Sequence, residues 1–311
     1  MTDPASVTDP TTTADAGEPP VEHRSRLRTT VETVLRNRLA VAGLLILAVL
    51  ILVAIFAHLI APFEINGVDI SNRLMGPSWT HLFGTDELGR DVFSRVVIAS
   101  RVSLEVGAIS VGIALGVGVP VGLIAGYYGG AVDSVLMRIM DVLFSIPAIM
   151  LAIAIVASLG SGIVNAMIAI GIVYTPIFAR ITRGSVLGLK ESVFVRAARS
   201  VGASDFRILR THILPNVIAP IIVQTSLSLA FAILAEAALS FLGLGVQPPD
   251  PAWGRMLTDG RQFFQQAPWM AFFPGLAIVV TVMSFNFVGD GLRDALDPQQ
   301  RSVIESRGAG A

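Results

Sequence analysis

Cysteine is absent from this 311-residue sequence, lysine occurs once, and charged residues make up only 14% of the chain. The lack of thiols excludes disulfide bonds, thiolate metal sites and cysteine nucleophiles. The one lysine, Lys190, follows Leu189, so the Gly-Lys-Ser/Thr sequence of a phosphate-binding loop is missing. If the activity of this protein consumes ATP, another chain has to hydrolyse it.

Motifs of common enzyme classes are also missing. The four histidines lie on different segments without a His-Glu-x-x-His zinc pattern, and no Gly-x-Ser-x-Gly nucleophile elbow occurs. The formal net charge is −1, which provides no overall basic field for nucleic acid. We therefore expect no catalytic residue, no metal site and no nucleic-acid partner.

What the sequence has in abundance is apolar side chains. Hydrophobic residues make up 53% of the chain and the mean hydropathy is +0.71. Soluble domains contain about 25% charged residues, so this composition predicts an all-α polytopic membrane protein. We expect a disordered cytoplasmic tail at 1–35, a first transmembrane helix at 36–61, an extracytoplasmic loop at 62–101, a five-helix core at 102–291 and a cytoplasmic tail at 292–311.

Runs with no charge, or with one charge in the case of the fifth, place the five helices of this core. They predict a second helix at 106–132, a third and fourth within 142–179, a fifth at 211–249 and a sixth at 262–289. The run at 142–179 is too long for one span, and its Ser-Leu-Gly-Ser-Gly stretch is a turn signal that divides it. Six spans return the chain to the side on which it began.

The distribution of basic residues orients these spans. Sixteen of the 22 basic residues flank the helices on the side of the two termini, many of them in the segment 180–210. The positive-inside rule then places both termini and this segment in the cytoplasm of a multi-pass inner-membrane protein. The opposite side holds the other six, Arg73, Arg90, Arg95, Arg101, Arg255 and Arg261.

Glycines and prolines occur within the apolar runs. The second helix carries glycines at a spacing that permits close helix packing, which favours an intrachain contact over a subunit contact. Prolines within the spans favour several broken helices, which suit a pathway better than an inert anchor. The glycines are Gly112, Gly116, Gly118, Gly122 and Gly126, and the prolines are Pro120, Pro147, Pro176, Pro220 and Pro274.

The cytoplasmic segment 192–215 has the pattern of a helix–turn–helix. Ser192 is placed to cap a short helix, and Gly202 suits its C-terminal stop because glycine accepts positive φ. Ser204 then caps a second helix with Asp205 in the first turn, and Pro215 closes the segment.

The phenylalanines of this segment, Phe194 and Phe206, are expected to be its apolar anchors, with arginines around them. An ordinary basic loop would explain the arginines. It would not explain the fixed positions of Ala197-Ala198, Gly202 and Leu214-Pro215.

This spacing resembles the EAA motif of ATP-binding-cassette (ABC) importer permeases, which reads Glu-Ala-Ala, three residues, Gly, nine residues and Ile-x-Leu-Pro. The chain departs from it at Arg196, where Glu is usual, and at His212, where Ile is usual. In that family the loop is the coupling helix, seated in a groove of the ATPase subunit. The resemblance assigns to the coupling loop Arg196, Ala197, Ala198, Gly202, Ala203, Asp205, Leu214 and Pro215.

Three further segments, 84–95, 236–245 and 248–254, look like those of the DppC/OppC-type second permease of peptide/nickel importers. The resemblance covers roughly residues 35–298 and implies a type I ABC importer permease fold and transport of di- or oligopeptides or related solutes. It implies a homologous B-type permease, two cytoplasmic ATPases or one fused ATPase, an extracytoplasmic solute-binding protein and the lipid bilayer as partners. ATP and Mg would be bound by the ATPases, with no cofactor in this chain.

Charged residues outside the expected spans form a second candidate site. Asp86, Arg90, Asp91 and Arg95 are spaced for local ion pairs that fold an exposed loop, and such pairs are individually weak. The alternative is contact with a binding protein or gating of the outer mouth. Trp253 lies in a loop that reads either as an interfacial lid or as a docking surface.

Glu236 is the third candidate, a carboxylate inside an expected span. Intramembrane carboxylates normally face protein or water, where a partner compensates them. Glu236 either hydrogen-bonds another helix, lines the pathway, or couples transport to protons, which would make the protein a secondary transporter. The coupling-loop pattern favours the importer over this alternative. Arg138 and Asp141, at i and i+3, are expected to form a local ion pair.

Overall fold

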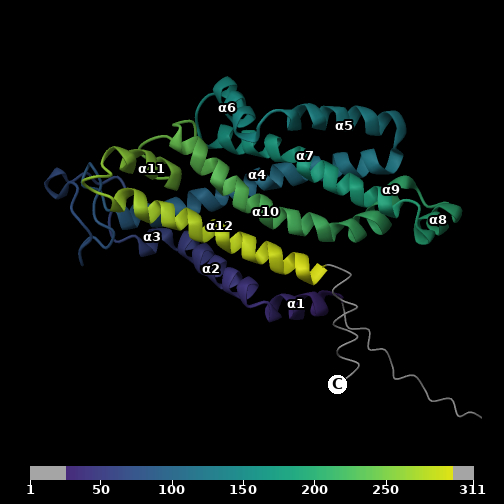
Figure 1. Ribbon diagram of the computed structural model, residues 1–311, viewed down its shortest axis with the longest axis horizontal. Coiled ribbons are helices and arrows are strands. Elements are labelled where there is room, and N and C mark those ends of the chain that lie inside the picture. The colour runs from purple at the N-terminus through teal and green to yellow at the C-terminus, as the bar shows by residue number, and fades with distance from the viewer. Residues whose placement is uncertain (1–25, 297–311) are drawn as a thin grey trace, which may run out of the picture.

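The computed structural model describes residues 26–296, in which the regular structure is helical and no strand occurs. Figure 1 labels the α-helices. In chain order, the elements are α1 (Arg26–Arg36), α2 (Arg38–Ile55), α3 (Ala57–Ile60), η1 (Ile70–Asn72), α4 (Val92–Tyr128), α5 (Gly130–Ser145), α6 (Ala148–Leu159), α7 (Ile163–Leu189), α8 (Val193–Ser200), α9 (Asp205–Arg207), η2 (Ile208–Ile213), α10 (Leu214–Phe241), α11 (Trp253–Gln262) and α12 (Trp269–Leu296).

Five helical segments are long and apolar enough to cross a membrane: α2, α4, α7, α12, and the continuous run of α9, η2 and α10. The pair α5 and α6 passes the same test together, bent by 93°, and brings the number to six when it is counted as one broken span. The prediction of an all-α membrane protein with six spans is therefore confirmed. The helices pack in the lateral order α2, α12, α10, α4, α7, with α5 and α6 beyond α7 (Figure 1).

Glycines line the most extensive helix contact in the described bundle, between α4 and α7. A Cβ atom on Gly122 would lie 2.4 Å from the carbonyl oxygen of Ala179, and one on Gly118 would lie 2.6 Å from that of Thr175. Gly126 is similarly tight against α7. The predicted intrachain contact is confirmed for these three glycines, whereas Gly112 and Gly116 have no neighbour within 4 Å of such an atom.

The segment boundaries differ from the expected ones at three places. Residues 26–35, expected to be disordered, belong to helix α1. The last part of the expected loop 62–101 is helical, because Asp91 caps α4 by accepting a hydrogen bond from the Ser94 N–H at 2.8 Å. The expected tail from 292 begins with the last turn of α12. The tail segments 1–25 and 297–311 lie outside the described residues.

The expectation of several proline-broken helices is wrong. Pro120, Pro176, Pro220 and Pro274 lie inside continuous helices. Only Pro147 coincides with a break, the bend between α5 and α6. Helices tolerate proline where neighbouring elements satisfy the freed carbonyl groups, and the bundle packs around two of these four prolines, Pro176 and Pro274, which are buried.

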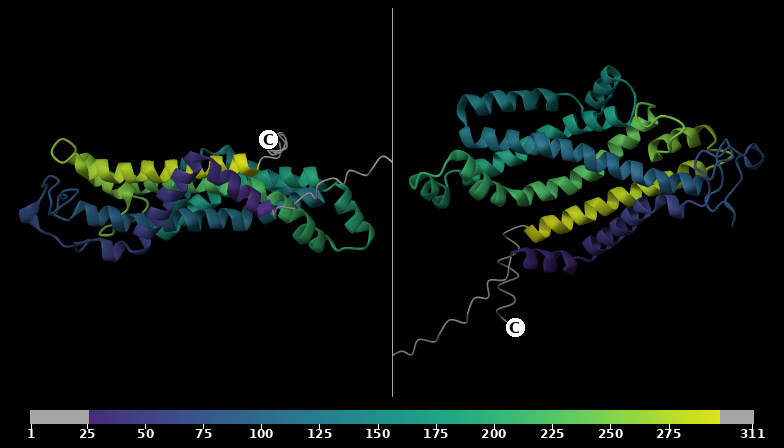
Figure 2. Two further views of the ribbon diagram at one scale, coloured as in Figure 1. Left: turned by 90° about the horizontal axis from the view of Figure 1, so that it is seen from below. Right: turned by 180° about the vertical axis from the view of Figure 1, so that it is seen from behind.

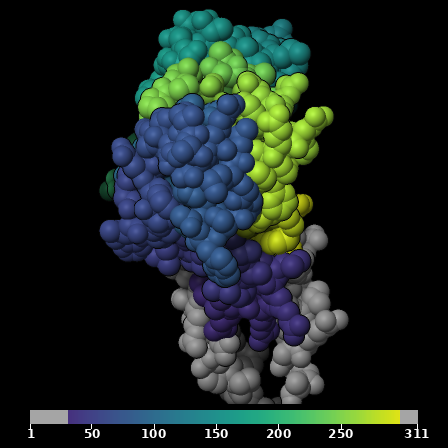
Figure 3. All heavy atoms as spheres, turned by 90° about the vertical axis from the view of Figure 1, so that its left-hand side faces the viewer, coloured from purple at the N-terminus to yellow at the C-terminus, as the bar shows by residue number. Residues whose placement is uncertain are grey.

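The bundle has two distinct ends. At the α8 end, the segment from α8 to η2 projects past the ends of α4 and α7, as both views in Figure 2 show. At the α11 end, the loop between α3 and α4 lies against the segment around α11 (Figure 3). Helix α1 contacts α12, so the first and last described elements lie side by side.

Candidate functional site

The α8 loop, residues 192–213, ends its first helix as the sequence predicts. Gly202 has φ of +80°, the Ala203 N–H donates to the Ala198 carbonyl at 3.1 Å, and the Gly202 N–H donates to Arg199 at 3.0 Å. These two bonds form a Schellman motif, in which the residue with positive φ is normally glycine. The predicted helix stop at Gly202 is thereby confirmed.

The capping serines behave differently from each other. Ser204 accepts a hydrogen bond from the Arg207 N–H at 3.4 Å, so the predicted cap of the second helix is present. Ser192 occupies the N-cap position of α8, but its side chain makes no capping bond. Pro215 does not close the segment, since residues 205–241 form one helical run. The Leu214 N–H instead bonds Leu209 five residues back, in a π-helical turn.

The expected apolar anchors of the α8 loop are wrong. Phe194 and Phe206 are exposed, at 42% and 72% of their surface. The buried anchors are the aliphatic residues Val195, Ile208 and Ile213, each fully buried in the main core. Val195 is buried in place of Phe194 because it lies on the face of α8 that turns toward the bundle.

The outer face of the α8 loop carries exposed apolar side chains. Val193 is 74% exposed and Val201, beside Gly202, is 84% exposed. With Phe194 and Phe206 they form the apolar tip, a name used below for these four residues. Large apolar residues exposed together mark an interaction site more often than a solvated surface. The guanidinium of Arg196 is also exposed, and no ion pair holds it within residues 26–296.

A tyrosine at the end of α4 ties the α8 loop to the bundle. The Tyr127 hydroxyl donates to Asp205 Oδ1 at 2.7 Å and accepts from Arg199 Nη2 at 3.3 Å. The Arg199 guanidinium also lies 5.7 Å from the centroid of the Tyr127 ring. One side chain of a spanning helix thus holds both helices of the loop. No pattern in the sequence predicts this contact beyond a tyrosine near a helix end.

Ion pairs connect α5 to α7 at the same end. Arg183 binds Asp133 through two parallel hydrogen bonds of 2.5 and 2.6 Å. Arg180 donates to Asp141 at 2.6 Å. The expected pair of Asp141 with Arg138 is therefore wrong, because the bend after α5 brings Asp141 to α7.

At the α11 end, the predicted charged cluster is assembled but buried. Arg90 Nε donates to Asp86 Oδ2 at 2.6 Å, and Arg95 Nε lies 3.7 Å from the same oxygen. The side chains of Asp86, Arg90 and Arg95 are 7%, 8% and 3% exposed. The expectation of weak, solvated pairs is corrected: the loop between α3 and α4 and the helix α11 cover them.

Asp91 joins this cluster through a different set of partners. One of its oxygens accepts the Ser94 N–H and hydroxyl at 2.8 and 2.7 Å, and the other lies 2.9 Å from His81 Nδ1. Asp91 therefore fixes the start of α4 and the preceding loop together. It is 3% exposed, so it presents no surface for a partner.

Two further carboxylates, which the sequence did not single out, complete the cluster. Burial raises the pKa of Glu87, and the neighbouring Asp86 raises it further. Burial also raises the pKa of Asp259 on α11, an effect that Arg255, Arg90 and Arg95 oppose. The cluster thus holds four carboxylates, Asp86, Glu87, Asp91 and Asp259, and three arginines with little contact to water.

Two tryptophans at this end, Trp253 and Trp269, are structural. Trp253 is 1% exposed, and its Nε1 donates to the Val96 carbonyl of α4 at 3.0 Å. Its expected place on a lid or docking surface is therefore corrected. Trp269 donates to the Thr85 carbonyl at 3.0 Å and closes the loop from the other side.

Glu236 on α10 is fully buried against α4. Its Oε1 accepts from the Ser240 hydroxyl at 2.7 Å and its Oε2 from the Ser103 hydroxyl at 3.3 Å. Of the uses left open by the sequence, the structure places Glu236 in an interhelical hydrogen bond. Within residues 26–296, no three His, Asp or Glu side chains are grouped so as to hold a metal ion.

Comparisons with known proteins agree with this architecture. Residues 118–302 match the family described as binding-protein-dependent transport system inner membrane component, and residues 25–77 match the N-terminal transmembrane domain of oligopeptide transport permease C. The dipeptide transport system permease protein DppC of Alkalihalophilus pseudofirmus is 50% identical over 94% of this chain and 98% of its own.

Glutathione transport system permease proteins GsiD are similarly related. Those of Pectobacterium atrosepticum and of an Escherichia coli O6:K15:H31 strain are 47% and 51% identical, over 86% and 85% of this chain and 89% and 88% of theirs. The fold matches a chain of the MetNI methionine ABC transporter in an inward-facing conformation, with a TM-score of 0.53 at 20% identity, over 65% of this chain and 96% of that one. The chain belongs to the binding-protein-dependent transport system inner membrane components, as a permease of the DppC/OppC type.

Proposed function

We propose that this chain is the permease subunit of an ATP-driven importer for di- or oligopeptides or related solutes such as glutathione. It forms half of the translocation pathway together with a homologous B-type permease. Family membership and the dipeptide and glutathione relatives support this solute class. We place the protein in the cytoplasmic membrane with both termini and the α8 loop in the cytoplasm, on the basis of its arginine distribution.

The observation that carries the proposal is the apolar tip of the α8 loop. Its four exposed apolar side chains lie before and after Gly202 in the sequence, on a loop that projects beyond the bundle (Figure 1). We assign this surface to a groove of a cytoplasmic ATPase, which binds ATP and Mg and performs the hydrolysis. This chain hydrolyses no ATP and holds no cofactor. Either two ATPase chains or one fused chain would satisfy the geometry.

The coupling is mechanical. Closure of the ATPases moves the α8 loop, and the contacts of Tyr127 and the buried Ile208 and Ile213 transmit the movement to α4 and α10. Tilting of the spanning helices then alternates access between the two faces of the membrane. At the α11 end, we assign delivery of the solute to an extracytoplasmic binding protein.

Gly202→Trp tests the docking surface. A Cβ on Gly202 has no neighbour within 4 Å, so the new side chain starts in open space. We expect the ATPases to be lost from the purified complex and uptake to fall at least tenfold, while the permease still inserts. Gly130→Trp is the matched control, since Gly130 also has positive φ (+54°) and open space but lies outside the α8 loop.

The control separates backbone strain from loss of docking, because both variants force a side chain into the left-handed region. A Gly202→Trp complex that kept its ATPases and its uptake would overturn the assignment. So would equal losses in both tryptophan variants.

A further inference from the structure

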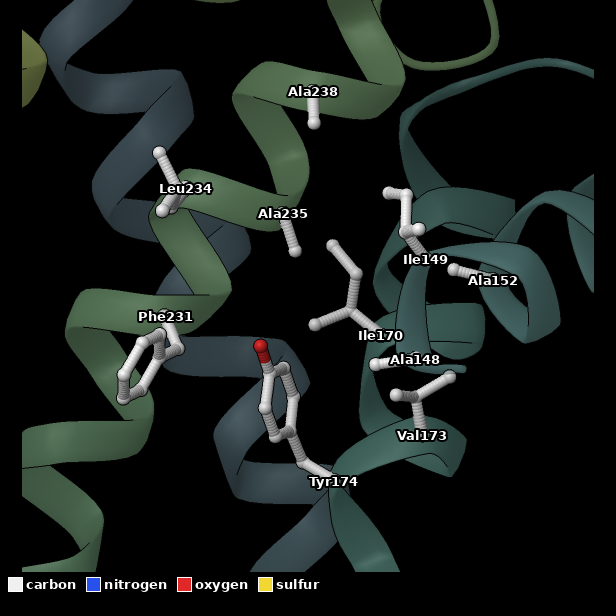
Figure 4. Close-up of a pocket in the computed structure, with 10 residues that line it drawn as sticks. All are labelled: Ala148, Ile149, Ala152, Ile170, Val173, Tyr174, Phe231, Leu234, Ala235 and Ala238. Atoms are coloured by element: carbon white, nitrogen blue, oxygen red, sulfur yellow. The ribbon is translucent and has the colours of Figure 1, made fainter. Parts of the chain in front are cut away.

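A pocket of about 240 Å³ opens between α6, α7 and α10 (Figure 4). Four of the ten residues that line it are alanines, in two pairs that face each other. Ala148 and Ala152 lie one turn apart on α6, and Ala235 and Ala238 lie one turn apart on α10. The pocket exists because the bend before α6 brings one small-residue face opposite another.

Tyr174 supplies the only hydroxyl among the residues that line this pocket. Figure 4 shows this hydroxyl pointing into the space between α6 and α10. It makes no hydrogen bond within residues 26–296. Tyr174 lies near the middle of α7, a spanning helix, and an unpaired hydroxyl at that depth is costly against lipid. The pocket therefore favours an occupant that can form a hydrogen bond with the Tyr174 hydroxyl, and a lipid acyl chain cannot form one.

The rest of the lining is apolar. Ile149, Ile170, Val173, Phe231 and Leu234 form the other walls. An apolar cavity of about 150 Å³ holds a benzene ring, so 240 Å³ accommodates an aliphatic or aromatic side chain. An occupant that combines such a side chain with a hydrogen-bonding group beside it is an apolar residue of a peptide.

We propose that this pocket receives an apolar side chain of the transported peptide, with the Tyr174 hydroxyl bonded to the adjacent peptide group. The inference rests on the proposed function and deepens it. It makes the permease, in addition to the binding protein, a determinant of which peptides pass. Peptides with bulky apolar residues gain a contact that glycine peptides lack.

The competing occupant is a helix of the second permease, since small residues also permit close helix approach. A larger residue in the pocket separates the two cases. Ala235→Phe fills the space between α6 and α10. The substitution lowers solute uptake if a solute uses this space, and it disrupts assembly if a helix of the second permease uses it. Ala154→Phe is the control, because Ala154 is exposed on α6 and does not line the pocket.

The test is uptake of leucyl-leucine and glycyl-glycine by the complete transporter, with its binding protein, in ATP-loaded proteoliposomes. We expect Ala235→Phe to lower leucyl-leucine uptake at least tenfold and glycyl-glycine uptake less than twofold, with the second permease still bound. Tyr174→Phe is expected to lower uptake of both dipeptides severalfold, because both contain the peptide group. Ala154→Phe is expected to match the wild type.

Three results would overturn the inference. The second permease could be lost from the Ala235→Phe complex, which would make the face a subunit contact. Both dipeptides could fall equally while the complex stays intact. A wild-type transporter that imports neither these dipeptides nor longer peptides nor glutathione would contradict the proposed solute class itself, whereas unchanged ratios in a transporter that imports both dipeptides would contradict this inference alone.

Discussion

The Tyr127 hydroxyl, at the last turn of α4, donates a 2.7 Å hydrogen bond to Asp205, at the first turn of α9. The bond joins a membrane-spanning helix to the loop that we assign to ATPase docking. Arg199 on α8 donates to the same hydroxyl, so a single oxygen connects three helices. Movement of the loop is therefore passed to α4 directly.

Tyr127→Phe should uncouple the ATPase from transport. The ring stays to pack on Arg199, whereas the hydroxyl loses its bonds to Asp205 and from Arg199. Loss of the bond to the charged acceptor alone costs about 1.5 kcal/mol. We expect basal ATPase activity to persist and its stimulation by solute to fall severalfold, measured on the reconstituted complex. The control is Tyr128→Phe, since Tyr128 is adjacent and 54% exposed. A Tyr127→Phe complex with wild-type stimulation would contradict the role of this bond.

Gly122→Ala should destabilise the bundle. The added methyl group would lie 2.4 Å from the Ala179 carbonyl oxygen, so α4 and α7 have to separate. Overpacking of this kind costs about 1–3 kcal/mol, more than the gain of up to about 1 kcal/mol in helix propensity. Gly116→Ala is the matched control, because it has open space and should be neutral or stabilising. Thermal unfolding of the purified variants measures the difference, and equal melting temperatures would argue against the α4–α7 contact.

Glu236→Gln should have little effect on transport. Glutamine keeps the size of the side chain and an acceptor for the Ser240 hydroxyl, which is the structural role seen here. We expect uptake within about twofold of the wild type and no effect of a protonophore on either protein. The proton-coupled alternative requires the opposite outcome, with uptake abolished by the substitution and by collapse of the proton gradient.

The charged cluster at the α11 end should make stability depend on pH. Because burial raises the pKa of Glu87, the folded protein binds more protons than the unfolded one between pH 4.5, the ordinary value, and the raised pKa. Stability therefore rises as pH falls through this window and levels off below it. Asp259, raised by burial as well, contributes with the same sign.

Melting temperatures between pH 7.5 and about 4.5 check this behaviour. Glu87→Gln is expected to reduce the rise on acidification, while the exposed Glu64→Gln leaves it intact. The scan stops there because Asp69, whose pKa the Ser71 hydroxyl lowers, acts in the opposite direction below 3.8. Identical pH profiles for wild type and Glu87→Gln would show that this carboxyl is not desolvated.

The sequence could predict the features that follow from local chemistry. Long uncharged runs mark the spans, and Gly202 marks a helix end because its backbone conformation favours glycine. It could not predict burial that depends on tertiary packing. The charged loop residues Asp86 and Arg95 look solvated in sequence, but α11 and the α3–α4 loop cover them.

The sequence also could not predict which residue a charged side chain pairs with, or which apolar side chain is buried. Asp141 has an arginine three residues before it, yet it pairs with Arg180 because the α5–α6 bend places the two helices side by side. Phe194 is the larger apolar residue on α8, but the orientation of the helix buries Val195 instead. Such outcomes depend on which face turns inward, and that is set by elements far away in the chain.

The central claim, that the α8 loop docks on an ATPase, is tested most directly by photo-crosslinking. The chain has no cysteine, so Val201→Cys introduces a single thiol at an 84% exposed position on the apolar tip. A benzophenone attached there through a maleimide should form an adduct with the ATPase chain in the assembled transporter. The same label on Trp79→Cys, a 98% exposed residue at the α11 end, should form none. Absence of the adduct from Val201, or its formation from Trp79, would contradict the account.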